Sequence, residues 1–466
     1  MNIHMVAICG TGMGSLAGLL QAAGHRVRGS DKAFYPPMSD RLRAWGIPTV
    51  EGFAAEHIAA DAELVIVGNA CRSDNPEARA AFDRGLAVMS FPQALAQMFL
   101  TDKHTMVVAG THGKTTSCSL IAYLLVRAER DPGFLIGGVP LDFASSFRLG
   151  AGPDFVVEGD EYDSAFFDKR PKFVHYRPQR VVLTSVEFDH ADIYADMDAY
   201  REAFAGLVAA IPDHGVLIAC VDDPEVAALA ESAGCRVVGY GFGAGAAWRA
   251  LDARVDGGRT RFRLQRPGCA ALELELPLAG RHNVANGLAA LALGAEVGID
   301  PQPGCALLAD FRGVARRMQV RGVEAGVTVV DDFAHHPTEV AATVRAARQR
   351  WPRAELVAVF EPRTNTSRRS VFQQRYPHSF AGAERVIIVP PFDIESIPVA
   401  ERFDSGALVE ALRGDGVDAM LVGDADTVVE RLASELEPES VVLIMSNGAF
   451  GGIHEKLLTA LRARGG

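Results

Sequence analysis

The chain has 466 residues, of which 48% are hydrophobic and 22% are charged. This length corresponds to about three domains of roughly 150 residues each, and the composition is typical of a protein that folds throughout. The formal net charge of −12 excludes the broad basic surface on which sequence-independent nucleic-acid binding depends. We therefore expect a multidomain enzyme that does not bind nucleic acid.

Seven cysteines are scattered singly, without a CxxC pair, so the sequence indicates neither a disulfide framework nor a zinc site. We expect them to be small buried hydrophobic residues. The N-terminus leads directly into the strand-like segment Ile3 to Cys9 without a charged leader, and the chain has no run of about 18 apolar residues. These features predict a cytoplasmic protein without a membrane partner; they assign no oligomeric state.

Short apolar runs, each followed by a glycine-containing turn and a helical pattern, recur along the chain and predict an α/β fold with parallel sheets. The strands expected first span residues 3–9, 26–30 and 63–68. A new strand at residues 105–109 opens a second nucleotide-type turn, so we place a boundary near Thr101-Asp102. Residues 1–101 are thus expected to form a Rossmann-like domain.

The same pattern continues through two further predicted domains. In residues 102–312 we expect a central P-loop ATPase-type sheet with a small antiparallel β insertion at 236–278, where alternating residues and glycine turns occur. Its other strands are expected at residues 105–109, 154–157, 180–184 and 216–219. A third, Rossmann-like domain is expected over 313–466. Its strands are expected at residues 327–330, 356–360, 385–389 and 441–445.

A phosphate-binding loop is predicted at Gly110-Thr111-His112-Gly113-Lys114-Thr115-Thr116, between the strand ending at Ala109 and a helical stretch. Glycines let backbone N–H groups converge on phosphate oxygens at a helix N-terminus. In such a loop Lys114 neutralises the terminal phosphates and the Thr115 hydroxyl binds Mg²⁺. The loop is two residues shorter than the general form, but the flanking strand and helix favour an ATP site over an incidental glycine turn.

Acidic residues follow two predicted strands of the central domain. One turn is Glu158-Gly159-Asp160-Glu161-Tyr162-Asp163, and the other is Glu187-Phe188-Asp189-His190. α/β enzymes place ligands at the carboxyl ends of strands, where carboxylates suit Mg²⁺ and an imidazole can hold a second ion or orient a nucleophile. A lone acidic turn is usually solvated surface, but two turns downstream of a phosphate loop favour a metal site. Four basic residues follow the first of these turns: Lys169, Arg170, Lys172 and His175. They either balance the charge of the metal site, hold the nucleotide sugar or are solvent-exposed charges without a specific role.

A second glycine turn, Gly10-Thr11-Gly12-Met13-Gly14, follows the first strand, and Asp31 lies about 20 residues further on. This spacing approximates the dinucleotide fingerprint, although Ser15 stands where the third glycine would be. The turn is compatible with NAD, with the pyrophosphate of a UDP-sugar or with a tight turn alone. Because a separate ATP site lies downstream, a second, non-redox nucleotide is the favoured interpretation.

Taken together, these motifs resemble the Mur ligases, and they occur in that family's order over nearly the whole chain. The resemblance also rests on Gly280-Arg281-His282-Asn283-Val284-Ala285-Asn286, Arg316-Arg317 and Asp331-Asp332-Phe333-Ala334-His335-His336-Pro337. It implies that the first domain binds the UDP moiety, the central domain ATP, and the third domain the incoming amino acid or peptide. Two departures are Ser185, where relatives often have Asn, and Phe333 in place of the common Tyr.

The resemblance also implies roles for individual residues. It places Lys114, Glu158 and His190 in catalysis and makes Thr115, Glu158 and His190 the Mg²⁺ ligands. The further residues that it places around ATP are Asn283, Asn286, Arg317, Asp331 and His335. Gly10 to Gly14 and Asp31 are assigned to the nucleotide sugar.

Within the family, four stretches resemble the members that join L-alanyl-γ-D-glutamyl-meso-diaminopimelate to UDP-N-acetylmuramate through an acyl phosphate. They begin at Tyr35, Asp160, Glu361 and Met445. Arg363 is expected to pair with a peptide carboxylate or to form an interdomain salt bridge, and Asn447 to line the peptide site. The alternatives are a ligase that adds L-alanine, a non-catalytic nucleotide-sugar binding protein, and an NAD-dependent redox enzyme.

Overall fold

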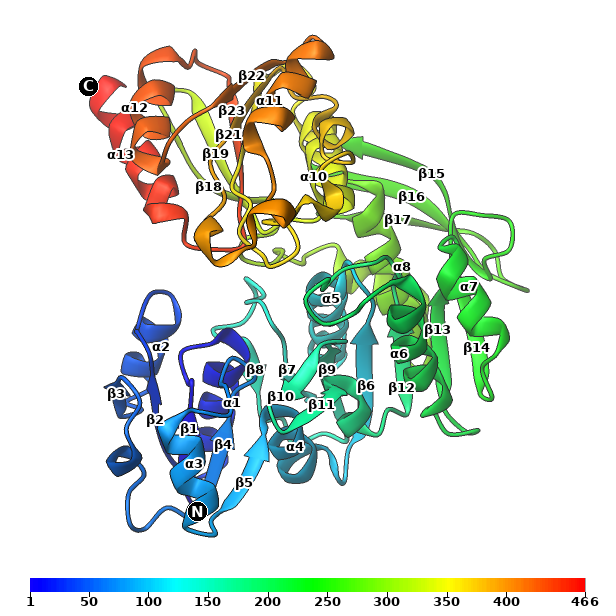
Figure 1. Cartoon of the computed structure of the whole chain (residues 1–466). Helices are drawn as coiled ribbons and strands as arrows, with labels where there is room; N and C mark the ends of the chain where they lie inside the picture. The colour runs from blue at the N-terminus through cyan, green and yellow to red at the C-terminus, as the bar shows by residue number, and fades with distance from the viewer. Residues whose placement is uncertain (466) are drawn as a thin grey trace.

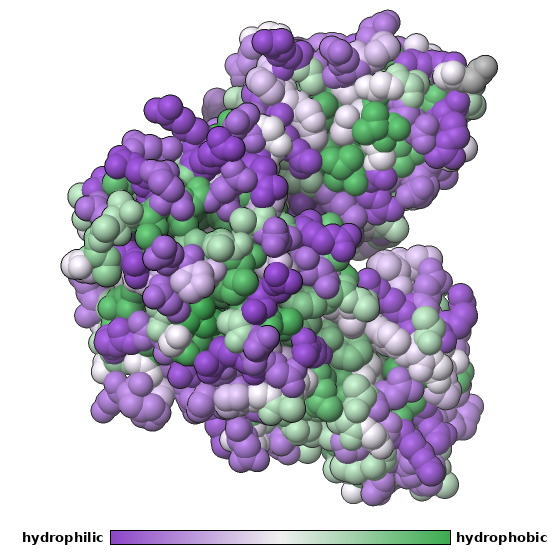
Figure 2. All heavy atoms as spheres, turned by 180° about the vertical axis from the view of Figure 1, so that it is seen from behind, coloured by the Kyte–Doolittle hydropathy of each residue, from purple (hydrophilic) through white to green (hydrophobic). Residues whose placement is uncertain are grey.

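The computed structural model describes residues 1–465 and contains three α/β units arranged around a notch (Figure 1). We refer to the units built on the three large sheets as the N-terminal, central and C-terminal domains. The central domain lies beside both of the others. Seen from behind, the N-terminal and C-terminal domains face each other across the open notch (Figure 2). The predicted boundaries near residues 101 and 312 fall before β6 and between α9 and β18.

The N-terminal domain is a five-stranded parallel sheet with the order β3-β2-β1-β4-β5. Its strands are β1 (Asn2–Val6), β2 (Arg26–Asp31), β3 (Thr49–Glu51), β4 (Leu64–Val67) and β5 (Ala87–Ser90). Its helices are α1 (Thr11–Ala22), α2 (Met38–Ala44), α3 (Pro76–Asp83) and α4 (Phe91–Leu95). The reversal of strand order beside β1 puts the glycine turn at the carboxyl edge of the sheet, where such folds bind nucleotides.

The central domain is a ten-stranded sheet with the order β17-β16-β15-β14-β13-β12-β6-β9-β7-β8. Its parallel strands include β6 (His104–Ala109), β7 (Gly133–Leu135), β9 (Asp154–Gly159), β12 (Arg180–Leu183), β13 (Val216–Cys220) and β14 (Arg236–Gly241). The others are β8 (Phe147–Arg148), β15 (Trp248–Asp256), β16 (Arg259–Gln265) and β17 (Leu272–Leu276), and a separate hairpin is formed by β10 (Asp163–Ala165) and β11 (Asp168–Pro171). The helices are α5 (Lys114–Arg127), α6 (Met197–Ala209), α7 (Pro224–Glu231), α8 (Arg281–Glu296) and α9 (Pro301–Leu308).

The predicted antiparallel region at 236–278 is confirmed only for β15, β16 and β17. β14 pairs in parallel with β13, and β15 pairs in parallel with β14 through Tyr240 and Trp248. The region therefore extends the central sheet instead of forming a sheet of its own. α5 and α8 pack together against one face of the sheet, in a hydrophobic core that includes Leu120 of α5, Leu288 of α8 and Phe262 of β16.

The C-terminal domain is a six-stranded sheet with the order β18-β19-β23-β20-β21-β22, in which only β18 is antiparallel. Its strands are β18 (Gln319–Glu324), β19 (Val327–Asp332), β20 (Leu356–Phe360), β21 (Arg385–Ile388), β22 (Asp418–Leu421) and β23 (Val441–Met445). Its helices are α10 (Pro337–Arg350), α11 (Ser405–Gly414), α12 (Ala425–Glu435) and α13 (Ile453–Gly465). Figure 1 shows α12 and α13 on one side of this sheet and α10 on the side nearer the central domain.

Two expectations from composition can be compared with the fold. Among residues 1–465, none of the helices combines the length and the apolar character that crossing a bilayer requires. The expectation that the cysteines are buried is confirmed for Cys9, Cys71 and Cys118, whereas Cys220, Cys235 and Cys305 are only partly buried. It is wrong for Cys269, which is exposed in the turn between β16 and β17. The turn of a β-hairpin projects into solvent, so no core residues pack over a side chain there.

A buried carboxylate holds the N-terminal domain together. Glu77 at the start of α3 has no exposed surface, and its oxygens lie 2.9 Å from His4 Nε2, 2.5 Å from Ser30 Oγ and 2.9 Å from His57 Nδ1. The backbone N–H of Ala54 donates to it at 3.2 Å. Burial raises the pKa of Glu77, but these donors together lower it below its usual value.

We predict that Glu77→Gln destabilises the N-terminal domain by about 1 to 3 kcal/mol, because the amide nitrogen of glutamine cannot accept a hydrogen bond and leaves buried donors unpaired. Since the folded pKa of Glu77 is lowered, its contribution is present above the unfolded pKa and is lost as the pH falls through the folded value. Urea unfolding between pH 7 and pH 3 measures both effects. The exposed Glu51→Gln variant is the control, and equal unfolding free energies in the two variants would contradict this role.

Candidate active site

Three neighbouring parallel strands bring the predicted motifs to one edge of the central sheet. β12, β6 and β9 lie side by side. The phosphate loop follows β6, the acidic turn follows β9, and the segment 185–190 follows β12. Because the carboxyl ends of parallel strands meet at one edge, segments far apart in sequence converge there.

Lys114, the first residue of α5, is held by the acidic turn. Its Nζ lies 2.9 Å from Glu161 Oε2 and donates to the Gly110 carbonyl at 2.6 Å. Burial favours the neutral amine, but Glu161 and the nearby carboxylates raise the pKa of Lys114 well above its usual range. The lysine is therefore a fully charged group in a buried position.

Glu161 connects Lys114 to the segment after β12. Its Oε1 lies 3.2 Å from His190 Nε2 and accepts a hydrogen bond from the Tyr200 hydroxyl at 3.1 Å. Burial raises the pKa of Glu161, but Lys114 and His190 together hold it well below its usual range. Conversely, burial lowers the pKa of His190, and its carboxylate neighbours raise it overall.

Glu158 is a second carboxylate at this edge. It accepts hydrogen bonds from the Thr115 hydroxyl at 3.2 Å and the Gly137 N–H at 2.7 Å. No cationic side chain among residues 1–465 lies within salt-bridge distance of it, and burial raises its pKa. A buried carboxylate beside a hydroxyl, without a cationic partner, has the ligand chemistry of a Mg²⁺ site.

A cavity of about 510 Å³ lies between the central and C-terminal domains. Its wall includes predicted nucleotide-site residues from both domains, namely His112, Gly113, Thr116, Asn283, Asn286 and Arg317. Asn286 Oδ1 accepts from the Ser117 hydroxyl at 3.0 Å, and a Cβ on Gly113 would come within 2.7 Å of this oxygen. Gly113 also has a φ of +77°, so the tight loop depends on glycine here.

Asp331 and His335, which are also predicted near ATP, do not line this cavity. Asp331 lies away from this cavity, with Oδ1 3.3 Å from His454 Nε2 and Oδ2 3.3 Å from Arg321. Its neighbour Asp332 lines the cavity instead, and burial raises its pKa to about 6. His335 lies in the seam between the domains, where its Nε2 is 4.0 Å from Asp189 Oδ2.

The N-terminal glycine turn lies at the start of the first helix, which is the position of the dinucleotide fingerprint. Gly10 to Gly14 span the start of α1, and Asp31 at the end of β2 accepts from the Cys9 N–H at 2.7 Å. Burial raises the pKa of Asp31. A Cβ at Gly14 would overlap the Met38 sulfur, so this glycine allows α2 to approach α1.

On the C-terminal domain, the Arg363 side chain lies against Gly448, the residue that follows Asn447. The Arg363 guanidinium lies 3.8 Å above the Phe392 ring, and its Nη1 is 3.3 Å from Glu361. Asn447 Oδ1 is buried without a hydrogen-bond partner among residues 1–465. Tyr35 of the N-terminal domain is close enough for Arg363 to lower its pKa, although burial raises that pKa overall. Arg363 therefore lies on the side of the C-terminal domain that faces the N-terminal domain.

One contributor to the site was not singled out from the sequence. Glu161 was part of the acidic turn, but nothing in its spacing distinguished it from its neighbours. Two of the four basic residues contact this turn: Lys172 is 3.1 Å from Asp160 and lies over the Tyr162 ring at 4.0 Å, and Lys169 is 2.6 Å from Asp163. The other two, Arg170 and His175, face Asp168 instead. Ser185 accepts from the His112 N–H at 3.1 Å, and the guanidinium of Arg317 lies 5.1 Å from the Phe333 ring.

Comparison with known families assigns all three domains to one group. The Mur ligase middle domain matches residues 108–294, the catalytic domain of the Mur ligase family matches residues 2–103, and the Mur ligase glutamate ligase domain matches residues 316–448. The chain therefore belongs to the Mur ligase family. It is an ATP-dependent enzyme that forms an amide bond.

Individual relatives align along the whole length. The chain is 39% identical to UDP-N-acetylmuramate–L-alanyl-γ-D-glutamyl-meso-2,6-diaminoheptandioate ligase of Escherichia coli strain K12, over 99% of this chain and 98% of the relative. It is 36% identical to UDP-N-acetylmuramate–L-alanine ligase of Halorhodospira halophila, over 100% and 94%. The crystal structure of a murein peptide ligase from Psychrobacter arcticus superposes with a TM-score of 0.76 at 34% identity and covers 99% of both chains.

We predict that Lys114→Ala reduces turnover by about a hundredfold or more, because a preorganised charge that stabilises transferring phosphate contributes on the order of 3 kcal/mol. ADP release under saturating ATP measures the loss. Lys456→Ala removes an exposed lysine from an ion pair with Asp426 and serves as the control. Full activity in Lys114→Ala would contradict the assignment of the phosphate loop.

Proposed function

We propose that this enzyme joins L-alanyl-γ-D-glutamyl-meso-diaminopimelate to the lactyl carboxylate of UDP-N-acetylmuramate, in the recycling of peptidoglycan. The main support is the 39% identity, along nearly the whole chain, to the Escherichia coli ligase named for these substrates. Both this peptide's length and its carboxylates require a long, polar amine site. We infer a cytoplasmic location because the reaction consumes ATP and a UDP-sugar.

The proposed peptide site lies on the C-terminal domain beside the notch. Arg363 is held flat against Phe392 and offers a planar pair of donors, which suits a carboxylate. Glu361 is buried and accepts from the Ser446 hydroxyl at 2.5 Å, so it fixes the strand ends around the arginine. Asn447 supplies a buried acceptor that still lacks a donor, and a peptide N–H would satisfy it.

The reaction needs concentrated positive charge. A carboxylate that approaches a triphosphate is repelled, so cations must face the phosphates before the bond forms. Lys114 supplies one charge from the central domain, and Arg317 supplies another from the C-terminal side of the cavity. Glu161 keeps Lys114 protonated and oriented.

We propose two chemical steps. First, a lactyl carboxylate oxygen attacks the γ-phosphorus of ATP, and the bond to the β,γ-bridging oxygen breaks to release ADP and leave an acyl phosphate. Second, the peptide amine attacks the acyl carbon, loses a proton and expels phosphate, which retains one oxygen of the original carboxylate. Water must be kept out between these steps because it would hydrolyse the acyl phosphate.

We propose Mg²⁺ as the metal ion, with Thr115, Glu158 and His190 as the residues that would hold it. The fit rests on the buried Glu158 carboxylate, which has only neutral hydrogen-bond donors. When bound, the ion would offset charge on the phosphate oxygens. His190 is kept beside Glu161, and this contact orients its ring toward the acidic turn.

A second candidate is addition of L-alanine to the same UDP-sugar. The 36% identity to the Halorhodospira halophila L-alanine ligase favours it. The two functions differ in the size and charge of the amine, and they use the same phosphate chemistry.

We predict that purified enzyme with Mg²⁺, ATP and UDP-N-acetylmuramate releases ADP with a kcat/KM for the tripeptide at least about a hundredfold above that for L-alanine. The reason is that polar groups built to pair with a substrate reject an analogue that leaves them unpaired. A preference for L-alanine would move the enzyme to the biosynthetic step and contradict the proposed peptide site.

In the same assay, the Arg363→Ala variant tests the proposed peptide site separately from the phosphate chemistry. It should raise the KM for the tripeptide about tenfold or more with a smaller change in kcat, because it removes a contact made outside the reacting centre. Arg462→Ala removes an exposed ion pair with Glu324 and should leave both constants unchanged.

A further inference from the structure

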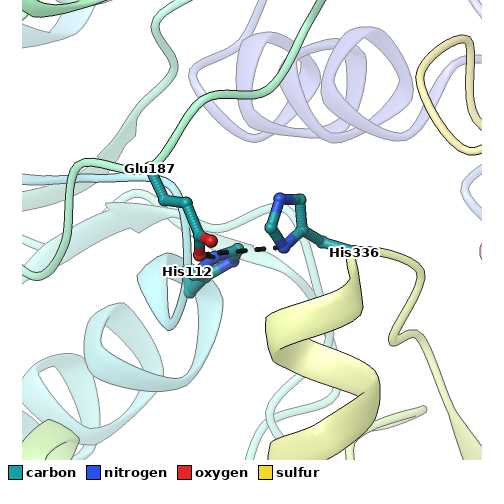
Figure 3. A group of neighbouring side chains, drawn as sticks. All are labelled: His112, Glu187 and His336. Carbon is teal, nitrogen blue, oxygen red and sulfur yellow. Dashed lines mark hydrogen bonds and ion pairs between the residues drawn. The ribbon is translucent and has the colours of Figure 1, made fainter. Parts of the chain in front are cut away.

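A cluster of titratable side chains joins the phosphate loop to the C-terminal domain. His112 from the loop, Glu187 from the segment after β12 and His336 from the start of α10 converge in the seam between the domains (Figure 3). His112 Nε2 lies 2.8 Å from Glu187 Oε2, and His336 Nδ1 lies 3.8 Å from the same oxygen. The centroids of the His112 and His336 rings are 4.7 Å apart.

Two imidazoles and a carboxylate are the ligand types of a zinc site, but two of these three groups are already engaged. The Arg375 guanidinium is paired with the other oxygen of Glu187, and it would repel a metal ion. His336 Nδ1 accepts from the Thr338 N–H at 3.2 Å, where it caps α10. The geometry thus disfavours a metal ion at this point.

A second carboxylate reaches His112 from the other domain. Glu339 on α10 places Oε1 3.4 Å from His112 Nδ1 and Oε2 3.4 Å from His335 Nδ1. His112 is thus flanked by one carboxylate of its own domain and one of the C-terminal domain. Burial lowers the pKa of His112, but the two carboxylates raise it to about 9, whereas burial and the neighbouring His112 lower the pKa of His336 to about 4.

These contacts join the central and C-terminal domains at the His112 ring. We propose that Glu339 is a positioning residue that, through its contact with the His112 imidazolium, holds the phosphate loop and the C-terminal domain at the spacing that forms the nucleotide cavity. His112 precedes Gly113 and Lys114 in the loop, and Glu339, His112 and Gly113 all line that cavity. The contact therefore links the position of α10 directly to the loop that receives the phosphates.

If Glu339 has this role, its removal changes the affinity for nucleotide in the direction opposite to the one that simple electrostatics predicts. If Glu339 were only a negative charge on the wall of a site for a polyanion, its removal would strengthen nucleotide binding. If it sets the domain spacing, its removal lowers the fraction of molecules with a formed cavity, and the apparent dissociation constant rises by the same factor. The sign of the change therefore separates the two roles.

The test is calorimetric titration of the full-length enzyme with ADP in Mg²⁺ buffer, which needs no amine substrate and does not depend on which amine the enzyme joins. Glu339→Gln should weaken ADP binding about tenfold. In a His112→Asn background, the same change should have little further effect, because the contact is already absent. Glu455→Gln, which removes an exposed partner of Arg321, is the matched control and should bind ADP as the wild type does.

Unchanged or tighter ADP binding in Glu339→Gln would overturn the proposal, and so would an equal loss with and without His112. Thermal unfolding of each variant shows whether the fold is intact. If Glu339→Gln fails to fold, the single His112→Asn variant must show the same weakening of ADP binding. An unaltered affinity in that variant would also overturn the proposal. Loss of the tripeptide preference alone would contradict the proposed substrate and leave this contact intact.

Discussion

The ion pair between Lys114 and Glu161 is the contact on which the rest of the active site depends. A lysine buried in a phosphate loop would tend to lose its proton, and a neutral amine cannot offset the charge of a triphosphate. Glu161 prevents this loss and is itself fixed by Tyr200 and faced by His190. One carboxylate therefore joins the phosphate loop, the acidic turn and the segment after β12.

Two domain boundaries surround this active site, one between the central and C-terminal domains and one between the N-terminal and C-terminal domains. The nucleotide cavity needs walls from both the central and the C-terminal domains, and His112 and Arg375 each contribute to ion pairs across that seam. The boundary between the N-terminal and C-terminal domains is the open notch of Figure 2. In the proposed reaction, the nucleotide sugar and the amine must meet at the phosphate edge of the central domain, and water must be kept out while the acyl phosphate exists.

Much of this architecture could be predicted because it depends on local patterns. Apolar runs located three of the five strands of the N-terminal sheet, four of the six strands of the C-terminal sheet and four central strands of the ten-stranded sheet. The phosphate loop was evident from its glycines, Lys114 and the flanking elements. The pairing of β14 with β13 was not evident, because glycine turns look alike in parallel and antiparallel regions and strand order is a non-local property. Likewise, the contact of Glu339 with His112 joins residues more than 200 positions apart, and no spacing rule covers it.

Asp331 and Asp332 illustrate a different limit. They are adjacent in β19, and successive side chains of a strand point to opposite faces, so only one of them can face the cavity. The motif contains both residues, and the sequence alone does not show which of them lies on the face of the sheet that points toward the cavity. In the structure Asp332 lines the cavity, while Asp331 meets Arg321 and His454.

The central claim is that the gathered positive charge lets a carboxylate oxygen attack the γ-phosphorus. It is tested most directly with UDP-N-acetylmuramate labelled with ¹⁸O in its lactyl carboxylate, followed by mass spectrometry of the phosphate released with the tripeptide as amine. When both carboxylate oxygens are labelled, each released phosphate should carry one ¹⁸O atom, because the oxygen that attacks phosphorus leaves with it. Phosphate without the label would show that the carboxylate is not phosphorylated, and it would contradict the account.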